Sequence, residues 1–388
     1  MRYIITAALF VCAALAAGSC AAADYSEADQ AIVRVCIMDD REELPVWLKN
    51  DYRIYAVNSD KTVMEGYRMA AKVTPSKDGI MIGKTEVKAP GIKIKEARSA
   101  KIFIGGKCFR GDVDIIKNDN GRLMAINYVA LEDYLYGVLY HEVSHRWPME
   151  VLKAQAIAAR TFALLQARNN KLQVYDLRSD IYSQVYGGSG SEKWSTNMAV
   201  NKTRGMVITY KGDLLPAYYH ATCAGRTEDA SNLWKVDMPP LDGVVCGFCE
   251  RSPYYKWTKS MPLWKIEEKL NAGGYKIGRI TSVSVVSRNP SGRVDKIEVR
   301  DASGTSVVLT GKDFRQMLGP NELRSTNFDA SVRMSSLVME GQGWGHGVGM
   351  CQWGAFGMAN SGRKAEEIIR HYYPGSEITT IDKIRDKL

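Results

Sequence analysis

The chain has 388 residues, of which 45% are hydrophobic and 24% charged, and its formal net charge is +9 at pH 7. These values are typical of globular proteins and exclude fibrous or largely disordered classes. The only long apolar run is at the N-terminus, which excludes a protein with several membrane spans. The basic excess suits an anionic polymer as partner, and both a nucleic acid and a cell-wall glycan fit that description.

The first 23 residues have the features of an export signal. A basic start is followed by an apolar stretch, residues 3–17, which is too short for a membrane span, and then by small residues. Cys20 follows an Ala-Gly-Ser segment that resembles a bacterial lipoprotein cleavage site, and simple cleavage near Ala23 is the alternative. The sequence therefore predicts an exported protein of the periplasm, cell envelope or extracellular space, with a membrane contact only through a lipid at Cys20.

Short β-type runs separated by polar or glycine turns predict a β-rich module over residues 24–110. The pattern continues to about Val129, and Asn120-Gly121 marks a hairpin because both residues tolerate positive φ. The candidate strands are Ala31–Met38, Tyr52–Val57, Gly79–Ile82, Lys101–Ile104, Val113–Ile116 and Leu123–Val129.

Apolar residues take up helical spacing from Leu131 onward. Leu131–Tyr140 is predicted to be a helix with two acidic residues in its first turn, where the helix dipole favours them. Pro148 opens a second, long helix that runs to about Arg168. The intervening segment His141–Trp147 is expected to break the helical path.

The remainder of the chain mixes helices and strands and has no internal repeat. The predicted elements are helices Glu192–Arg204, Gln352–Ser361 and Lys364–Tyr372, and strands Met206–Tyr210, Leu215–His220, Ile280–Ser287, Val294–Arg300 and Ser306–Leu309. The fold class is therefore α+β, with the β-rich N-terminal module followed by a mixed helix and strand core, residues 111–388, that contains a substrate groove.

Glu142 differs from the other carboxylates of the helical region. Glu132 and Asp133 fall in a first helical turn, but Glu142 falls where that helix ends and the dipole disfavours an anion. This field, together with aromatic neighbours, is expected to raise the pKa of Glu142, as a general acid near neutrality requires. Protonated His141 and His145 would oppose the shift. A surface ion pair is the alternative interpretation.

Residues 341–354 form a glycine-tryptophan loop in which Gly alternates with other residues. Such a run is unsuited to the interior of a strand or helix and suits backbone that approaches a ligand or adopts positive φ. Trp344 and Trp353 offer flat faces for sugar rings, with His346 and Gln352 as hydrogen-bond partners. A tight structural loop with core tryptophans is the alternative. No Gly-Lys-Ser/Thr follows, so it is not a phosphate loop.

A candidate metal site lies within residues 220–250. His220 and Cys223 form one short pair, and Cys246 and Cys249 form another. This spacing resembles a tetrahedral zinc site of one imidazole and three thiolates, and four protein ligands would make the zinc structural. A disulfide, most simply between the last two cysteines, is the alternative in an exported protein.

A series of segments between Leu131 and about Gly362 occurs in the order typical of one family. They are Leu131–Val138, Glu142, Trp147-Pro148, Leu152–Thr161, Ser183–Gly188, Tyr219–Thr222, Gly225–Thr227 and Gly343–Met350. Together they resemble the stage II sporulation protein D and amidase-enhancer family. An ordered set of this kind is much more specific than any single motif.

The resemblance implies a reaction. The family's best-known branch is similar to lytic transglycosylases, which cleave peptidoglycan glycan strands between N-acetylmuramic acid and N-acetylglucosamine. Glu142 would protonate the glycosidic oxygen and then, as a carboxylate, remove the proton from the muramyl C6 hydroxyl, which gives a 1,6-anhydro product. Neither a second carboxylate nor a cofactor is then needed for catalysis. The resemblance also implies glycan contacts at Gln184 and Tyr186.

The resemblance also implies partners. Members act preferentially on glycan without stem peptides, so an N-acetylmuramoyl-L-alanine amidase is the implied companion, and glycan strands rather than nucleic acid are the implied ligand. The family's other branch suggests an alternative, a non-catalytic protein that binds glycan and stimulates such an amidase. A basic wall-anchored scaffold is a third interpretation, which leaves the glycine-tryptophan loop unexplained.

Two departures from the family pattern have consequences. Ser144 stands where the family often has Pro, which changes the geometry expected at the helix break. Some members bind zinc through Cys and His just before the Gln-Val-Tyr segment, where this chain has Arg178, Tyr182 and Ser183. A zinc site at residues 220–250 would therefore be a separate one.

Overall fold

The computed structural model describes residues 31–59, 61–97, 101–180 and 183–387. The predicted export signal, with Cys20, lies outside the described residues. Within those ranges, no helix combines the length and the apolar character that a membrane crossing requires. Helices and strands alternate after a strand-rich N-terminal region, which confirms the α+β class.

An eleven-stranded sheet forms the N-terminal part of the molecule. Its strands are β1 (Ile32–Arg41), β2 (Leu44–Ala56), β3 (Thr62–Pro75), β4 (Ile80–Ile82), β5 (Thr85–Val87), β6 (Gly91–Lys95), β7 (Lys101–Ile104), β8 (Lys107–Phe109), β9 (Asp112–Lys117), β10 (Leu123–Ala130) and β11 (Leu177–Arg178). In β2, buried Leu44, Val46 and Leu48 alternate with exposed residues, as a sheet with one covered face requires.

The sheet continues past residue 110. β9 pairs with β6 and β10, and β10 pairs with β1, so residues 112–130 belong to the same sheet as residues 32–109. The boundary expected between residues 110 and 111 therefore falls inside one continuous sheet. Asn120 and Gly121 lie in the predicted turn between β9 and β10, and Gly121 has a φ of 73°.

Three helices pack beside this sheet: α1 (Leu131–Glu142), α2 (Met149–Asn169) and α3 (Trp194–Lys202). Pro148 is the N-cap residue of α2, and the helical path is broken just before it, as the sequence predicted. Arg160 on α2 and Glu132 on α1 form a buried ion pair with two hydrogen bonds, of 2.8 and 2.7 Å. This pair fixes α1 against α2 and therefore fixes the end of α1, where Glu142 lies.

The end of the chain returns to these helices. α6 (Gln352–Asn360) and α7 (Ala365–Tyr372) pack against α2, and β22 (Glu377–Thr380) pairs with β12 (Met206–Tyr210), which also pairs with β13 (Asp213–Leu214). Of the predicted strand Leu215–His220, only β14 (Tyr219–His220) forms, and it pairs in parallel with β21 (Met350–Cys351). This pairing places Tyr219 next to Met350, although the two residues are far apart in the sequence.

Residues 256–342 form a second β-rich body. It contains two three-stranded sheets with the orders β15-β20-β19 and β16-β17-β18. Its elements are β15 (Lys256–Pro262), α4 (Leu263–Ala272), β16 (Ile280–Arg288), β17 (Val294–Asp301), β18 (Ser306–Thr310), α5 (Gly311–Leu318), β19 (Phe328–Arg333) and β20 (Ser336–Gln342). The two sheets share one apolar core with both helices.

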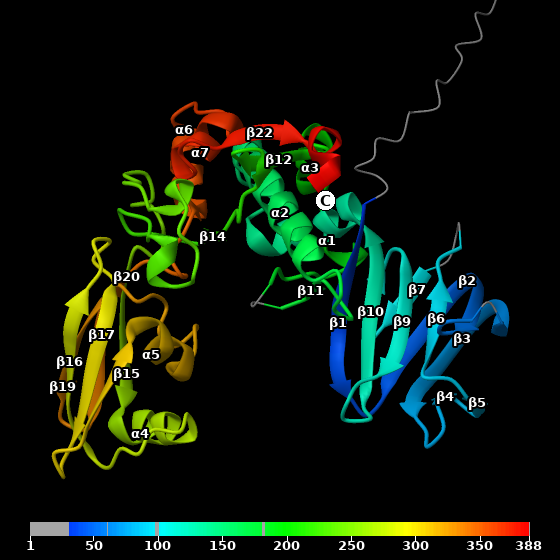
Figure 1. The fold of residues 1–388 in the computed structure, drawn as a ribbon, viewed down its shortest axis with the longest axis horizontal. Coiled ribbons are helices and arrows are strands. Elements are labelled where there is room, and N and C mark those ends of the chain that lie inside the picture. Colours follow the sequence, from blue (N-terminus) through cyan, green and yellow to red (C-terminus); the bar gives the residue numbers. More distant parts are fainter. Residues whose placement is uncertain (1–30, 60, 98–100, 181–182, 388) are drawn as a thin grey trace, which may run out of the picture.

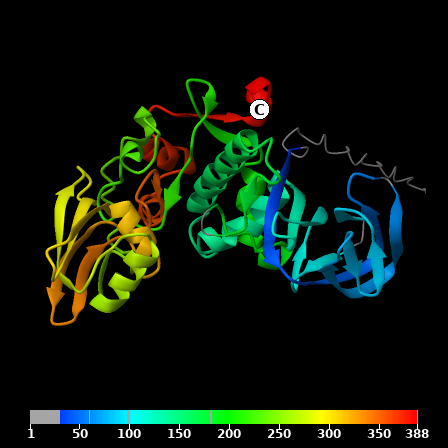
Figure 2. The same cartoon turned by 60° about the horizontal axis from the view of Figure 1, so that its bottom comes forward.

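The two β-rich bodies lie at opposite ends of the molecule, with α1, α2 and α3 between them (Figure 1). Turning the molecule shows the same separation, with the yellow and orange body far from the blue sheet (Figure 2). Residues 341–354, predicted as a glycine-tryptophan loop, begin within β20, include β21 (Met350–Cys351) and end within α6, so they connect the second body to the central helices.

Candidate functional site

Glu142 is the last residue of α1, and Val143 after it is extended. Its side chain is half-buried, and this burial raises the pKa of Glu142 to about 7. Three hydrogen bonds to the carboxyl oppose the shift: from the Val185 N–H at 3.3 Å, and from the side chains of Tyr219 and Gln352. The raised pKa was predicted, but burial is its main cause, and not the helix dipole. In the described part of the chain, Glu142 forms no ion pair, contrary to the alternative interpretation.

A chain of side-chain hydrogen bonds leads to this carboxyl from the interior. The Tyr134 hydroxyl donates to Gln184 Oε1 at 3.0 Å, and Gln184 Nε2 donates to the Tyr219 hydroxyl at 2.9 Å. Because the Tyr219 oxygen accepts from Gln184, its own proton is free to point at Glu142. This series of hydrogen bonds therefore orients the Tyr219 hydroxyl as a donor towards the carboxylate form of Glu142.

Gln352 approaches Glu142 from α6, which it begins. Its Nε2 also donates to Oε1 of Gln155 on α2, at 3.3 Å, and both glutamines are buried. Four separate parts of the chain thus meet at Glu142: the end of α1, the loop that holds Val185, β14 with Tyr219, and the start of α6.

Aromatic side chains gather beside the helix break. The Trp353 ring lies 5.1 Å from that of Trp147 and 5.3 Å from that of Phe356, and all three are half-buried. Trp147 belongs to the segment that follows Glu142, and Trp353 follows Gln352. The predicted sugar-facing residue Trp353 therefore lies in the same region as Glu142 and has a partly exposed ring.

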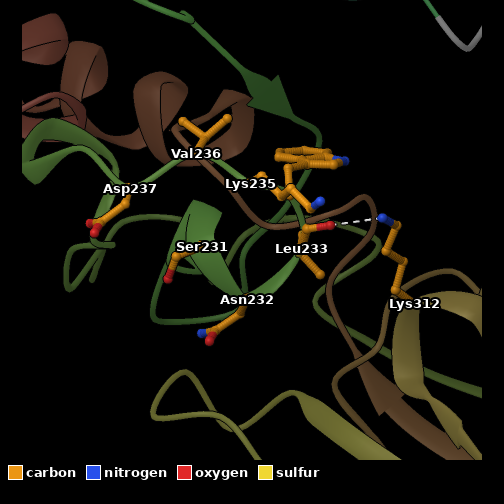
Figure 3. Close-up of a pocket in the computed structure, with 8 residues that line it drawn as sticks. Ser231, Asn232, Leu233, Lys235, Val236, Asp237 and Lys312 are labelled. Atoms are coloured by element: carbon orange, nitrogen blue, oxygen red, sulfur yellow. Dashed lines mark hydrogen bonds between the residues drawn. The ribbon is translucent and has the colours of Figure 1, made fainter.

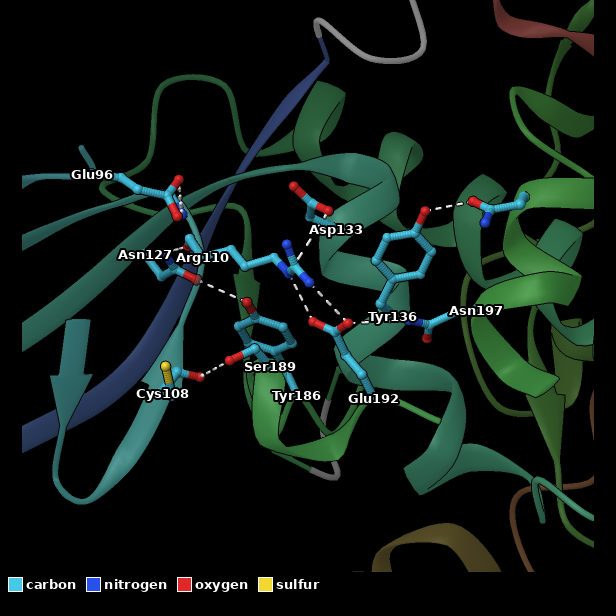
Figure 4. A network of polar contacts seen from close by, with 12 residues as sticks. Glu96, Cys108, Arg110, Asn127, Asp133, Tyr136, Tyr186, Ser189, Glu192 and Asn197 are labelled. Atoms are coloured by element: carbon cyan, nitrogen blue, oxygen red, sulfur yellow. Dashed lines mark hydrogen bonds and ion pairs between the residues drawn. The ribbon is translucent and has the colours of Figure 1, made fainter. Parts of the chain in front are cut away.

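Gln184 and Tyr186 do not line a surface, contrary to the expected glycan contacts. Their side chains are only 1% and 2% exposed. The Tyr186 hydroxyl donates to Asn127 Oδ1 on β10 at 3.0 Å, inside a polar network that also joins Arg110 to Glu192 (Figure 4). A fully buried side chain cannot contact a polymer. Both residues therefore have a structural role in the interior beneath the site.

Trp344 and His346 are not brought to Glu142 by any contact among the described residues. Trp344 lies 4.4 Å from the Tyr254 ring, centroid to centroid, with the Arg324 guanidinium 5.3 Å from its centre. His346 Nδ1 accepts from the Val348 N–H at 3.1 Å, so Nε2 carries the proton that it donates to the Tyr219 carbonyl at 2.9 Å. Burial, with a contribution from Arg315, lowers the pKa of His346 to about 3. His346 is thus a neutral residue that fixes backbone.

An open hollow adjoins the segment of residues 231–237 (Figure 3). It is lined by residues 231–237 and Lys312, whose Nζ donates to the Leu233 carbonyl at 2.7 Å. The Trp234 ring in its wall lies 5.2 Å from the His346 ring and 4.5 Å from the Tyr218 ring. None of the groups that hydrogen-bond Glu142 lines this hollow.

The alternating glycines of the loop have a structural explanation at two positions. Gly347 has a φ of 93°, and a Cβ there would lie 2.5 Å from the Arg293 guanidinium carbon. Gly349 has a φ of 69°, and a Cβ there would lie 2.1 Å from the Tyr218 carbonyl oxygen. Glycine is needed at both because the backbone is left-handed and closely packed. This part of the loop is the tight structural loop of the alternative interpretation.

The cysteines of residues 220–250 do come together, but with a different fourth member. The sulfur atoms of Cys223, Cys246, Cys249 and Cys351 all lie within 4.8 Å of one another and are buried. His220 is not part of this cluster, and its Nδ1 donates to the Val348 carbonyl at 3.0 Å. The expected set with one imidazole is therefore corrected to four sulfurs. All four cysteines are free thiols, so the disulfide alternative is not what the structure contains.

Sequence reasoning missed two residues of these sites. Tyr219 lay in a recognised segment, but only the pairing of β14 with β21 brings its hydroxyl to Glu142. Cys351 is distant from the other cysteines in the sequence, and no role was predicted for it. The one available signal was its place beside Gln352, at the start of a predicted helix.

Comparison with known proteins finds similarity to stage II sporulation proteins and to an amidase enhancer. The family model described as "Stage II sporulation protein" matches residues 119–210, and a domain of unknown function matches residues 244–349. An uncharacterised protein of Brachyspira hyodysenteriae is 31% identical over 362 residues, 93% of this chain and 96% of the relative. Stage II sporulation protein D of Bacillus subtilis is 30% identical over 68% of this chain and 78% of the relative. The amidase enhancer of Bacillus subtilis is 28% identical over 63% of this chain and 40% of the relative.

Proposed function

Because the chain belongs to the stage II sporulation protein D and amidase-enhancer family, we propose that it is a peptidoglycan lytic transglycosylase with Glu142 as its one catalytic carboxyl. The observation that carries the proposal is the state of this side chain. A half-buried carboxyl with a pKa of about 7 is present both protonated and ionised near neutral pH. One group can then act first as acid and afterwards as base.

The reaction proposed is an internal transfer. The protonated Glu142 gives its proton to the oxygen that links N-acetylmuramic acid to N-acetylglucosamine, and the bond from that oxygen to the muramyl C1 breaks. The N-acetylglucosamine part leaves with a free hydroxyl. The Glu142 carboxylate then takes the proton of the muramyl C6 hydroxyl, whose oxygen bonds to C1. The 1,6-anhydro ring closes, Glu142 is protonated again, and no water is consumed.

The surroundings of Glu142 support a mechanism with one carboxylate. Its hydrogen-bond partners are a backbone N–H, a hydroxyl and an amide, so none is a second carboxylate. The Tyr219 and Gln352 donors stabilise the ionised form that must remove the C6 proton. The partly exposed Trp353 ring is the surface against which we expect a sugar ring to stack.

The setting that we propose follows from the same reaction. The substrate is glycan from which stem peptides have been removed, so an N-acetylmuramoyl-L-alanine amidase acts before this protein. A wall polymer is reached only by an exported protein, which agrees with the predicted signal, whether or not Cys20 carries a lipid.

A second candidate function is non-catalytic. The similarity to the amidase enhancer of Bacillus subtilis favours a protein that binds glycan and stimulates a cell-wall amidase. In that case the pKa of Glu142 would have no use in turnover, which is why we rank this function second.

Incubation of the purified chain with peptide-free glycan strands, followed by mass analysis, tests the proposal. We expect 1,6-anhydro-muramyl ends that disappear in Glu142→Gln and persist in Glu340→Gln, an exposed carboxylate on β20. Ordinary reducing ends would indicate a hydrolase. No cleavage, together with faster turnover by an added amidase, would establish the enhancer function instead.

A further inference from the structure

The four-cysteine cluster of Cys223, Cys246, Cys249 and Cys351 has no part in the proposed reaction. Sulfurs from three separate segments meet in the apolar core that α2, α6 and α7 share. We propose that these four cysteines bind one zinc ion as thiolates, in a structural site that fixes the segments carrying Tyr219 and Gln352.

The spacing of the sulfurs fits zinc and does not fit disulfides. The Cys223 and Cys249 sulfurs are 3.6 Å apart. A tetrahedral zinc ion with bonds of about 2.3 Å places its sulfur ligands about 3.8 Å apart. A disulfide needs about 2.05 Å. Four protein ligands leave no open position, which makes the site structural and not catalytic.

The local backbone has the form of a metal-binding turn. Cys246 and Cys249 are separated by two residues, and Gly247 between them has a φ of 65°. This spacing lets two sulfurs on one turn reach the same ion. Cys351 is the N-cap residue of α6, so its sulfur lies beside the first N–H groups of the helix, which have no partner within the helix itself.

Hydrogen-bond donors already point at the sulfurs. The Cys223 N–H and the Gly354 N–H donate to the Cys351 sulfur at 3.2 and 3.3 Å. The Tyr372 hydroxyl lies 3.1 Å from the Cys246 sulfur. Donors of this kind stabilise thiolates and orient them on a metal.

A buried cation next to the cluster gives an independent argument. When zinc binds, four thiols release their protons to water and the complex carries a net charge of −2. Arg293 is fully buried and donates to the carbonyls of Cys223 and Arg226 at 2.9 and 3.1 Å. Among the described residues, Arg293 forms no ion pair with a carboxylate. The buried Glu228 carboxylate and the cysteines of the cluster both act electrostatically on this guanidinium. A zinc-thiolate dianion would add a second negative partner beside it.

The zinc site would also affect the position of the groups that hydrogen-bond Glu142, and the importance of this effect rests on the proposed function. Cys223 follows β14, which carries Tyr219, and Cys351 ends β21 and precedes Gln352. Zinc would therefore join the two segments whose side chains hydrogen-bond Glu142. Tyr219 and Gln352 would be held by the metal site, which makes its cysteines positioning residues.

Metal analysis of the purified chain, prepared without added metal, tests the site. We expect about one zinc ion per chain, and cobalt substitution should give the strong charge-transfer bands of tetrahedral thiolate coordination. Cys351→Ser should lower zinc affinity at least about 10-fold, since it removes a ligand. His220→Gln, Cys36→Ser and Cys108→Ser should keep the zinc, because these residues lie outside the cluster.

Several results would overturn the proposal. A zinc-free chain with disulfides among the four cysteines would do so, as would zinc that survives Cys351→Ser but is lost in His220→Gln. If Cys351→Ser does not fold, the unchanged chain still gives the answer, because a chelator should release zinc and expose four thiols to a thiol reagent. If the chain binds zinc but does not cleave glycan, the metal site is supported and only the proposed reaction is rejected.

Discussion

Tyr219 hydrogen-bonds the carboxyl of Glu142 and at the same time accepts a hydrogen bond of 2.9 Å from Gln184. The buried amide therefore determines where the Tyr219 proton points. The carboxyl is thus subject to two opposing influences: burial favours its protonated form, and donors favour its ionised form. A pKa of about 7 is the balance between them.

The first prediction concerns the pH dependence of cleavage. The first step needs protonated Glu142, so kcat/KM should fall about 10-fold per pH unit above the pKa of about 7. Initial rates on peptide-free glycan between pH 5 and 9 would test this. A limb near pH 4.5, the ordinary value for Glu, would show that burial does not act on this group in solution.

The second prediction concerns stability. Because the folded protein raises the pKa of Glu142 from 4.5 to about 7, the proton stabilises the fold below about pH 4.5, and this contribution is lost as pH rises through about 7. Relative to Glu142→Gln, the unchanged protein should lose about 2 kcal/mol between pH 4.5 and 8, a figure reduced for partial exposure. Urea unfolding at both pH values measures the difference. A constant difference would contradict the shift.

The third prediction separates positioning from folding at Tyr219. Tyr219→Phe removes a donor to the carboxylate, so the pKa of Glu142 should rise further, and the alkaline limb of the pH profile should move up by about one unit. Cleavage at pH 6 should fall about 10-fold, because ionised Glu142 is a less well placed base. Tyr275→Phe, in the distant second body, is the control and should leave the profile unchanged. A Tyr219→Phe enzyme with an unmoved limb would remove Tyr219 from the mechanism.

The fourth prediction concerns glycan stacking on Trp353. Trp353→Ala should weaken kcat/KM by about 10- to 100-fold, and Trp353→Phe should recover most of the loss, because it keeps an aromatic face. Trp264, which is 63% exposed on α4, is the matched control and should tolerate Ala without effect. Equal losses in the two alanine variants would point to general surface effects and not to a binding face.

The fifth prediction concerns the buried ion pair between α1 and α2. Glu132→Gln leaves the Arg160 guanidinium buried without its partner and should cost about 3 to 5 kcal/mol of unfolding free energy. Glu65→Gln breaks the exposed pair with Arg53 and should change stability by less than about 1 kcal/mol. Chemical denaturation compares the two. A small loss for Glu132→Gln would mean that water reaches Arg160.

Local signals in the sequence predicted the local structure well. The acidic first turn of α1, the proline before α2 and the Asn120-Gly121 turn each depend on residues close together in the chain, and each is found as predicted. The position of Glu142 at the end of α1 follows from the same local rules.

Pairings between distant segments could not be predicted in this way. The sequence favoured His220 as a metal ligand because it is three residues from Cys223, but β14 turns its ring towards the Val348 carbonyl and β21 supplies Cys351. Gln184 and Tyr186 were assigned to the surface from the resemblance, which gives no information on burial. The elements β15, β19 and β20 of the second body have no strong local signal and were missed.

The pairing of β12 with β22 affects when the molecule becomes functional. Residues 206–210 complete their small sheet only when residues 377–380 are present, and Gln352, which hydrogen-bonds Glu142, also belongs to the last part of the chain. Contacts of such long sequence separation form slowly. During synthesis, α1 and α2 are therefore made long before the groups that adjust the acidity of Glu142. An unfinished polypeptide would carry a carboxyl without these donors, so the proposed activity would be acquired only at the end of folding.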